Sequence, residues 1–405
     1  MKNKKLEANI IIVINNMRKI MDMFLGPFLT AYFIKTSKDS INSISIYYIF
    51  SYIILALVTY FVASIIKNKF RIGMFRIGVI LNFIYILVII FLKERIVDYL
   101  PLISFLYGLS AAIYWFPYNL FVINKVDNSN RTRFTVKLQI ISSITGIVCP
   151  FILGSLISIT NYHLTAIIVL IISLIQIILS FLLTKDEKSD YDNFNIKRTF
   201  NIIKKNNQIR NMSKVELLIG MNQSGALDTL KTILIFNSFK TNMNLGIITS
   251  IATIISMIFI RLYGKLYKNK NDKNIIMLSG LLPLIASLIL IMYKSSLTII
   301  IYTIIYVTFT SILSLTREIR LYNIADSYIV DKNNQCEYFV IREFYLNLGR
   351  IIGFILLLIA GLINTELSLY IVMIILTFTI LLMANNLKKI DKFEKDKLAQ
   401  KEQVY

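Results

Sequence analysis

Four of the charged residues inside two long apolar segments of the chain are spaced as pairs. Arg18 and Asp22 are four residues apart in the first segment, and Asp228 and Lys231 are three residues apart in a later one. In a helix, either spacing places both side chains on one face. Burial favours the protonated form of a carboxyl group and a nearby cation favours the ionised form, so either aspartate is suited to take up and release a proton. The alternative is a static ion pair that holds neighbouring helices together.

A second group of polar residues lies towards the C-terminus. At the usual helical rise, Arg350 lies about 12 Å further along a helix than Arg342 and Glu343. Its planar guanidinium suits a carboxylate or phosphate group of a substrate. The alternative for Arg350 is a pair with Glu318 or with backbone carbonyls. We expect Arg317, Glu318, Arg342 and Glu343 to act in gating at the cytoplasmic ends of their helices.

Three aromatic residues and one amide lie together in another apolar segment. Tyr114, Trp115 and Tyr118 are suited to stack on an apolar or cationic ligand, and Asn119 follows them. The alternative is the belt of aromatic residues that is typical of membrane interfaces. The single histidine, His163, is expected in a short loop, exposed to solvent.

The sequence has no Gly-rich phosphate loop, no metal-ligand spacing and no nucleophile with a base beside it. We therefore expect neither an enzyme nor an ATP-driven pump, and neither a metal ion nor any other cofactor. Cys149 and Cys336 are too few and too differently placed for a disulfide framework or a zinc site. Both are predicted to be free thiols.

The elements that position these residues are predicted to be membrane-spanning helices, because hydrophobic residues make up 56% of the 405 residues. Such a composition leaves too little polar surface to cover soluble domains. The sequence predicts an all-α integral membrane protein with about 12 transmembrane helices, since apolar runs of about 20 residues span a bilayer. The predicted spans are 10–33, 44–66, 73–92, 100–124, 138–160, 164–184, 213–237, 244–264, 274–293, 297–316, 338–362 and 367–387.

The distribution of basic residues predicts the orientation. Of the 44 Lys and Arg residues, 32 fall on the side of the N-terminus and six on the opposite side. Cytoplasmic loops are enriched in Lys and Arg, so both termini and the central segment are predicted to be cytoplasmic. The net charge of +21 is thereby explained by topology, and the expected partner is the lipid bilayer rather than nucleic acid. No signal-peptide cleavage site follows the first apolar run, which is therefore expected to be retained.

A weak internal repeat divides the chain into two pseudo-symmetric six-helix bundles. An offset of 206 residues places Asn16 on Asn222 and Asp22 on Asp228. Repeats of this kind are common in transporters. The predicted parts are an N-terminal six-helix bundle at 1–184, a cytoplasmic central loop at 185–212, a C-terminal six-helix bundle at 213–387, and a charged cytoplasmic tail at 388–405.

Two short motifs lie within this arrangement. A basic loop, Ala63-Ser-Ile-Ile-Lys-Asn-Lys-Phe-Arg71, follows the second predicted helix, and Gly146, Pro150 and Gly154 are spaced by four in the fifth. With two six-helix halves, the chain resembles the major facilitator superfamily, in particular a poorly characterised bacterial branch. That family usually carries an Asp four residues before Arg71, where this chain has a lysine. The glycine-proline motif is similar to that of the family's exporters, and small residues let helices approach closely.

The resemblance implies a secondary transporter of the cell membrane, in which the first helix of each half lines a central cavity. We expect proton-coupled export of a small amphipathic molecule by alternating access, so that the protein is an antiporter. It is expected to act as a monomer. The alternatives are a lipid or amphiphile translocase of the same fold, and a transport-inactive receptor or scaffold. The residues expected along the substrate and ion pathway are Arg18, Asp22, Tyr114, Trp115, Tyr118, Asn119, Asn222, Asp228, Lys231, Asn347 and Arg350. The residues expected in gating or packing are Arg71, Gly146, Pro150, Gly154, Arg317, Glu318, Arg342 and Glu343.

Overall fold

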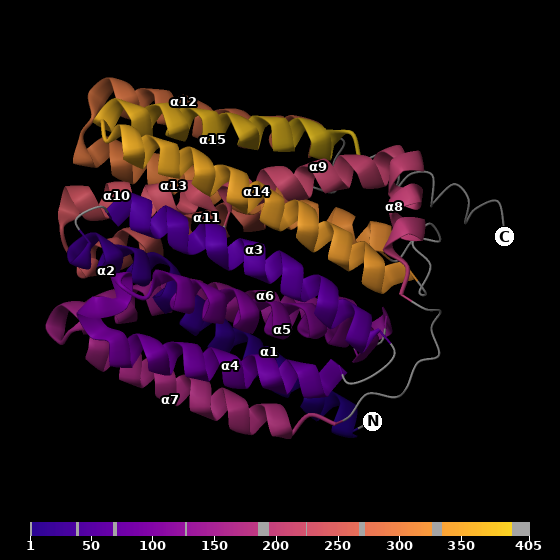
Figure 1. Cartoon of the computed structure of the whole chain (residues 1–405). Helices are drawn as coiled ribbons and strands as arrows, with labels where there is room; N and C mark the ends of the chain where they lie inside the picture. Colours follow the sequence, from indigo (N-terminus) through magenta and orange to yellow (C-terminus); the bar gives the residue numbers. More distant parts are fainter. Residues whose placement is uncertain are drawn as a thin grey trace. The chain divides into compact units, whose positions relative to one another are not determined.

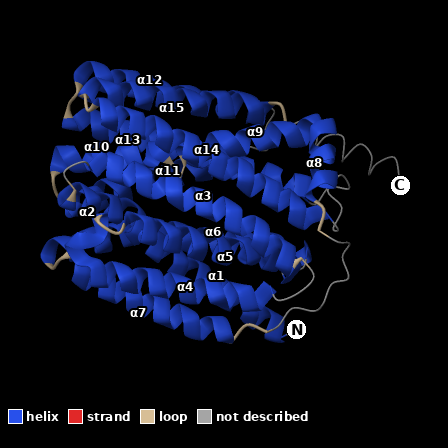
Figure 2. Cartoon of the chain, viewed as in Figure 1, coloured by secondary structure: helices blue, strands red, loops and turns tan. Residues whose placement is uncertain are grey.

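Helices joined by short connections make up the part of the chain that the computed structural model describes, and no strand occurs there (Figures 1 and 2). The described residues are 2–37, 40–67, 71–125, 128–184, 194–223, 225–266, 272–325 and 334–390. Part of the predicted central loop, 185–193, and most of the predicted tail, 391–405, therefore lie outside the described residues.

Ten of the described helices are long and apolar enough to cross a membrane. Each coincides with one of the predicted spans, because a backbone in lipid must satisfy its hydrogen bonds within its own helix and needs a long apolar run to do so. These helices are α3 (Ser40–Ile66), α4 (Arg71–Leu92), α5 (Leu100–Lys125), α6 (Asn128–Ile159), α7 (Tyr162–Phe181), α11 (Asn242–Leu266), α12 (Asp272–Tyr293), α13 (Ser296–Ala325), α14 (Gln335–Ile363) and α15 (Glu366–Lys388).

The other two predicted spans are helical but interrupted. The first consists of α1 (Lys2–Met23), a π-helical turn η1 (Phe24–Phe28) that contains Pro27, and α2 (Leu29–Thr36). The seventh consists of α9 (Asn207–Asn222) and α10 (Ala226–Phe239), and Gln223 between them has extended backbone angles. Proline removes a backbone donor and so favours such an irregular turn. The charged pairs of the sequence analysis thus lie on the two broken helices.

The chain divides into two compact units. Unit 1 comprises Met1–Asp192 and Lys231–Thr253, and unit 2 comprises Asn193–Leu230 and Ile254–Tyr405. Within unit 1, α5 packs against α3 and α4, and α7 packs against α1 and α4. Within unit 2, α9 packs against α14 and α15, and α12 packs against α13 and α15. The units differ from the predicted bundles 1–184 and 213–387 by the placement of 231–253, so the bundle boundaries stay a prediction.

Two arginines of α4 bind the C-terminal ends of other helices in unit 1. Arg71 donates from Nη2 to the carbonyl oxygen of Lys67 at 3.0 Å, just beyond the end of α3. Arg76 donates to the carbonyl oxygens of Ser180 at 3.1 Å and Leu183 at 2.8 Å, at the end of α7. Basic side chains satisfy terminal carbonyls and stabilise the negative end of the helix dipole. Arg71 was predicted from its position in the loop motif, whereas Arg76 was not.

The segment predicted as a central loop contains the short helix α8 (Ile196–Lys205), which corrects that prediction for these residues. Asn195 caps it by accepting from the backbone N–H of Arg198 at 3.1 Å. Thr199 and Ile203, four residues apart, are its buried face, and the helix packs against α9 and α14. Glu337 of α14 accepts from the backbone N–H of Asn195 at 2.9 Å. The polar composition concealed the helix, because only two of its ten residues are buried.

Candidate functional site

Arg18 and Asp22 form a buried ion pair on α1 of unit 1. Nε of Arg18 donates to Oδ1 of Asp22 at 2.8 Å. The Arg18 side chain is fully buried, whereas that of Asp22 is 32% exposed. Both terminal nitrogens of the guanidinium are buried and have no hydrogen-bond partner among the described residues. The pair therefore joins a cation with unused donors to a carboxylate that solvent can reach.

The aromatic residues of α5 form the surroundings of this arginine. The Arg18 guanidinium carbon lies 4.8 Å from the centre of the Tyr114 ring, a cation–π distance. Tyr118 stacks on Tyr114 at 5.9 Å between ring centres, and half-buried Trp115 meets both rings edge-on. Tyr114 and Tyr118 belong to the hydrophobic core of unit 1, so neither ring lies in a lipid-facing belt. Asn119, the amide that follows, is half-buried.

Two buried amides near these residues were missed by sequence reasoning. Gln176 of α7 donates to the carbonyl oxygen of Ile14 at 3.0 Å, and lies 3.5 Å from the Tyr114 hydroxyl. Asn82 of α4 contacts the sulfur of Met21 at 3.1 Å. Both side chains are fully buried, and their carbonyl oxygens have no hydrogen-bond partner among the described residues. The sequence signal for each was a single amide within a long apolar run. Burying an amide without a hydrogen-bond partner is costly, so such a residue indicates a polar contact inside the protein.

Asp228 lies at the start of α10, within unit 2, beside two buried tyrosines of α13. The Tyr306 hydroxyl forms a hydrogen bond with Asp228, and Tyr302 is an electrostatic neighbour of the same carboxylate. The two rings stack at 5.9 Å between centres. Lys231 follows three residues later in the same helix, but the division between the units falls just before it. A pair between Asp228 and Lys231 therefore stays a prediction.

Asn16 and Asn222, which the repeat aligns, have similar local geometry. Each amide donates to the carbonyl oxygen four residues earlier, at 2.7 Å for Asn16 and 2.8 Å for Asn222. Each also joins its helix to a hydroxyl on another one. Asn16 accepts from Ser142 and Thr145 of α6, whereas Asn222 donates to Thr379 of α15 at 2.9 Å. The partner of Asn16 is the fifth predicted span of the first half, whereas the partner of Asn222 is the sixth of the second half. The similarity between the two asparagines is therefore limited to the geometry within their own helices.

A buried network of four charges lies within unit 2, and sequence reasoning missed its centre, Glu216. This carboxylate of α9 is 1% exposed and accepts from Arg317 of α13 at 2.7 and 2.6 Å. Arg342 of α14 donates to it at 3.2 Å and to Glu343 at 2.7 Å. Glu318, which was predicted to belong with Arg317, is exposed on α13. The partners of Glu216 are 101 and 126 residues away in the chain, so no local spacing indicates them.

Arg350 is half-buried on α14 and contacts Asn347 of the same helix. Its Nη1 donates to Oδ1 of Asn347 at 2.9 Å, and Asn347 in turn donates to the Glu343 carbonyl oxygen at 2.8 Å. Asn347 is fully buried. The predicted pathway residues Asn347 and Arg350 are thus brought together, next to the Glu216 network along the same helix.

The glycine-proline motif of α6 faces α11 within unit 1. A Cβ atom added at Gly154 would lie 2.5 Å from the carbonyl oxygen of Asn242 and 3.2 Å from Cα of Gly246. One added at Gly246 would overlap the carbonyl oxygen of Pro150. At Gly146, the nearest atom is a methyl carbon of Thr253 at 3.5 Å, an ordinary contact. Close backbone approach therefore concerns Gly154 and Gly246, and sequence reasoning did not find the latter.

We expect Gly154→Ala to destabilise the protein by about 1–3 kcal/mol, because the added methyl group has no space between the two helix backbones. Gly146→Ala is the matched control on the same helix, where a methyl group fits. The measurement is the midpoint of thermal unfolding of both purified variants in detergent. Equal midpoints for the two variants would exclude close packing as the role of Gly154.

His163 differs from its prediction as a solvated loop residue. It lies in the first turn of α7, and its Nε2 is 3.2 Å from the Tyr32 hydroxyl of α2. Aromatic packing holds it there, because its ring also meets the Tyr162 ring edge-on.

The chain is similar to membrane transporters over most of its length. The family model of the Major Facilitator Superfamily matches residues 12–333. An uncharacterized protein of Bacillus subtilis (strain 168), YqgE, is 25% identical over 319 residues, which cover 77% of this chain and 73% of that protein.

Two solved structures have the same fold. The nucleoside transporter NupG superimposes with a TM-score of 0.66 at 14% identity, covering 97% of this chain and all of the other. A bacterial homologue of the iron transporter ferroportin, in an inward-facing state, has a TM-score of 0.66 at 14% identity and covers 96% of this chain and 98% of its own. At such identities the likeness establishes the fold and leaves the substrate open. By its family match and its fold, the chain belongs to the Major Facilitator Superfamily and is a multi-pass membrane transporter.

Proposed function

We propose that this chain is a proton-coupled secondary transporter that exports a small amphipathic molecule by alternating access. The Arg18–Asp22 pair is the observation that carries the proposal. A charge within a membrane helix costs several kcal/mol unless it serves a pathway or is fully paired. Arg18 is fully buried but uses only one of its three nitrogens in a hydrogen bond among the described residues. Its remaining donors suit an acceptor on the substrate, and Asp22 supplies the counter-charge that keeps the buried guanidinium in place.

The direction of transport rests on the contact between α6 and α11. Gly154, which belongs to the motif that resembles that of exporters, approaches Gly246 of α11 closely through the backbone. Ser250 of α11 also donates to the carbonyl oxygen of Ile147 of α6 at 2.6 Å. Small residues at such a contact let the two helix backbones approach closely.

The proposed proton carrier is Asp228, with Asp22 held ionised by its arginine. Arg keeps its charge at physiological pH, whereas Lys readily loses its proton when it is desolvated. Asp228 precedes Lys231 on α10 and contacts a tyrosine hydroxyl that itself carries no charge. We therefore assign proton exchange to Asp228 and the static counter-charge to Asp22.

We expect Asp228→Asn to abolish the dependence of flux on a pH gradient while substrate binding persists. Proteoliposomes with pyranine inside report proton movement, and the amphiphiles ethidium and 1-anilinonaphthalene-8-sulfonate serve as probes. Each is measured with and without an imposed gradient, for wild type and for the variant. If Asp228→Asn transports a probe against its gradient at the wild-type rate, Asp228 is not the proton carrier, and that role would belong to Asp22, Glu318 or Glu343. No movement of any probe by wild type would favour the transport-inactive alternative.

The proposed location is the cell membrane, with both termini and 185–212 in the cytoplasm. A cysteine placed at exposed Lys197 should resist an impermeant thiol reagent in intact cells, and one at exposed Lys240 should react, after Cys149 and Cys336 are replaced by alanine. The opposite labelling pattern would reverse the orientation. We further propose that the protein acts as a monomer, which the native mass of the solubilised chain tests.

A further inference from the structure

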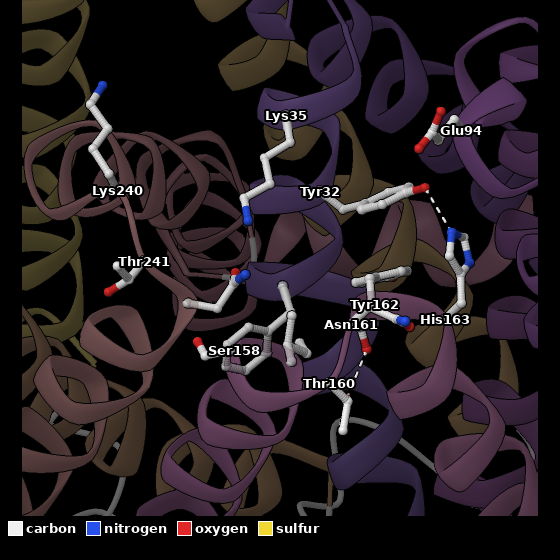
Figure 3. A pocket seen from close by; sticks show the side chains of 13 residues that line it. Tyr32, Lys35, Glu94, Ser158, Thr160, Asn161, Tyr162, His163, Lys240 and Thr241 are labelled. Atoms are coloured by element: carbon white, nitrogen blue, oxygen red, sulfur yellow. Dashed lines mark hydrogen bonds between the residues drawn. The ribbon is translucent and has the colours of Figure 1, made fainter.

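A cavity of about 480 Å³ lies within unit 1, beside α2, and neither Arg18 nor Asp22 is among the described residues that line it (Figure 3). Every residue that lines it belongs to this unit. It is formed by α2, by the turn between α6 and α7, by the turn between α10 and α11, and by Glu94 of the 3-10 turn η2 (Lys93–Val97). The cavity has no part in the proposed pathway.

Two helices begin at this cavity. Asn161 caps α7 by accepting from the backbone N–H of Leu164 at 2.8 Å, and Thr241 accepts from the backbone N–H of Asn244 at 3.2 Å at the start of α11. The backbone N–H of Met243, in the same turn of α11, donates to the hydroxyl of Ser158 at 3.0 Å. Helix N-termini carry a partial positive charge and so favour anions nearby. The lining residues Asn161 and Thr241 therefore mark two positive helix ends that converge on one space.

Two lysines add full positive charges to the same lining. Neither Lys35 nor Lys240 forms an ion pair with any residue that the structure describes. Figure 3 shows Lys35 extending towards the middle of the group and Lys240 pointing away from it. Glu94 is the one carboxylate among the described residues of the lining, and it lies on the opposite side from Lys240 in the same view. Lys35 is thus the cation placed to contact a bound anion, and Lys240 contributes at longer range.

The remaining wall is aromatic and offers an unused hydroxyl. Tyr162 stacks on Tyr32 at 4.3 Å and on Phe24 at 4.6 Å between ring centres. It is 5% exposed, and its hydroxyl has no hydrogen-bond partner among the described residues. Nδ1 of His163 likewise has none there, while its Nε2 meets the Tyr32 hydroxyl. Buried hydroxyls are nearly always hydrogen-bonded, so the Tyr162 hydroxyl is accounted for if a bound group accepts from it.

We propose that this cavity binds a small organic anion. Its carboxylate or phosphate group lies at Lys35 and the N-terminal ends of α7 and α11, and its planar or apolar part lies against Tyr32 and Tyr162. A charge-assisted hydrogen bond from the lysine and the positive field of the two helix ends supply the recognition. The same chemistry is presented by a free small molecule and by the headgroup of an anionic lipid. The proposal concerns binding only and does not depend on transport.

Binding is tested with the full chain purified in a maltoside detergent. The probe is 4-fluorobenzoate, followed by broadening of its fluorine resonance, and 4-fluorobenzamide is the neutral comparator of the same shape. We expect saturable binding of the benzoate and at least roughly tenfold weaker binding of the amide, since loss of one charge-assisted contact is worth about that factor. Lys35→Gln should weaken benzoate binding by a similar factor, and Lys240→Gln and Tyr162→Phe by less.

Lys294→Gln is the matched control, because Lys294, like Lys240, follows a helix with a positive φ but does not line the cavity. It should bind the benzoate as wild type does. Thermal unfolding midpoints establish that each variant is folded. Equal binding of the two probes, no saturable binding of the benzoate, or wild-type binding by folded Lys35→Gln would each overturn the proposal.

Competition separates the two sources of the anion. Dihexanoyl phosphatidylglycerol and unlabelled benzoate are each titrated against bound 4-fluorobenzoate, with dihexanoyl phosphatidylcholine as the zwitterionic comparison. Displacement at lower concentration by the phosphatidylglycerol alone assigns the cavity to a lipid headgroup, and displacement at lower concentration by benzoate assigns it to a free small anion. Displacement by the phosphatidylcholine as effectively as by either anion would show that charge is not recognised, and would overturn the proposal.

Discussion

Replacing Glu216 by glutamine should lower the free energy of unfolding by about 3–5 kcal/mol, the usual cost of removing one partner from a buried ion pair. The carboxylate is 1% exposed and receives hydrogen bonds from both Arg317 and Arg342. Glutamine keeps the shape but removes the charge, so two arginines of α13 and α14 are left with one buried carboxylate, Glu343, between them. The measurement is the thermal unfolding midpoint of the purified variant, together with its yield from the membrane.

Glu318→Gln is the matched control for this result. Glu318 directly follows Arg317 but is exposed on α13, so its replacement should change the unfolding free energy by less than about 1 kcal/mol, as for surface charges in general. If Glu318→Gln proved the more damaging of the two, the network would not be the stabilising feature that its geometry indicates. Wild-type stability of Glu216→Gln would lead to the same conclusion.

Asp22→Asn should have an effect of similar size in unit 1, about 3–5 kcal/mol, because it leaves the fully buried Arg18 without a counter-ion. The double variant Arg18→Met with Asp22→Asn should recover most of the lost stability, since no buried charge remains. It should nevertheless fail to transport, because both the proposed substrate contact and the carboxylate are gone. Stability and flux are measured on the same preparations.

An exposed pair at a similar spacing provides the comparison for Asp22. Arg95 and Asp98 lie 3.8 Å apart with side chains 72% and 66% exposed, so Asp98→Asn should alter stability by less than about 1 kcal/mol. Full transport by the double variant would contradict a role for the buried pair in the pathway. If the double variant is no more stable than Asp22→Asn, then Asp22 does not stabilise the protein by compensating the buried charge of Arg18.

The sequence could predict the spans because apolar length is dictated by the bilayer. The Arg18–Asp22 contact could also be predicted, because four residues on one helix determine which side chains meet. The Glu216 network could not, since its members come from three helices whose register is set by packing. Gly246 and Gln176 were missed for the same reason, because each contributes one residue to a contact with a distant segment. Helix α8 was hidden by its charge, although its apolar positions Ile203 and Phe200 were visible.

Residues that the sequence pattern groups together have different surroundings in the structure. Tyr114 and Tyr118, expected along the pathway, belong to the hydrophobic core of unit 1, and the Tyr114 ring lies beside Arg18. Gly146 has space for a methyl group, although its motif suggested the same role as Gly154. Such distinctions depend on tenths of an ångström between helices, which a spacing pattern does not contain.

The π-helical turn at Phe24–Phe28 is equivalent to one inserted residue in an otherwise continuous helix. Each residue of an α-helix advances by about 100° around the axis, so the insertion rotates everything beyond it by that amount. Tyr32 and Lys35 on α2 consequently face a different direction from the one that they would have if α1 continued through this stretch as a regular α-helix. A relative of this protein that lacked one residue between Met23 and Leu29 would keep the buried ion pair but turn Tyr32 and Lys35 away from the cavity. The length of this short stretch is therefore a marker by which homologues that retain the cavity can be told from those that have lost it.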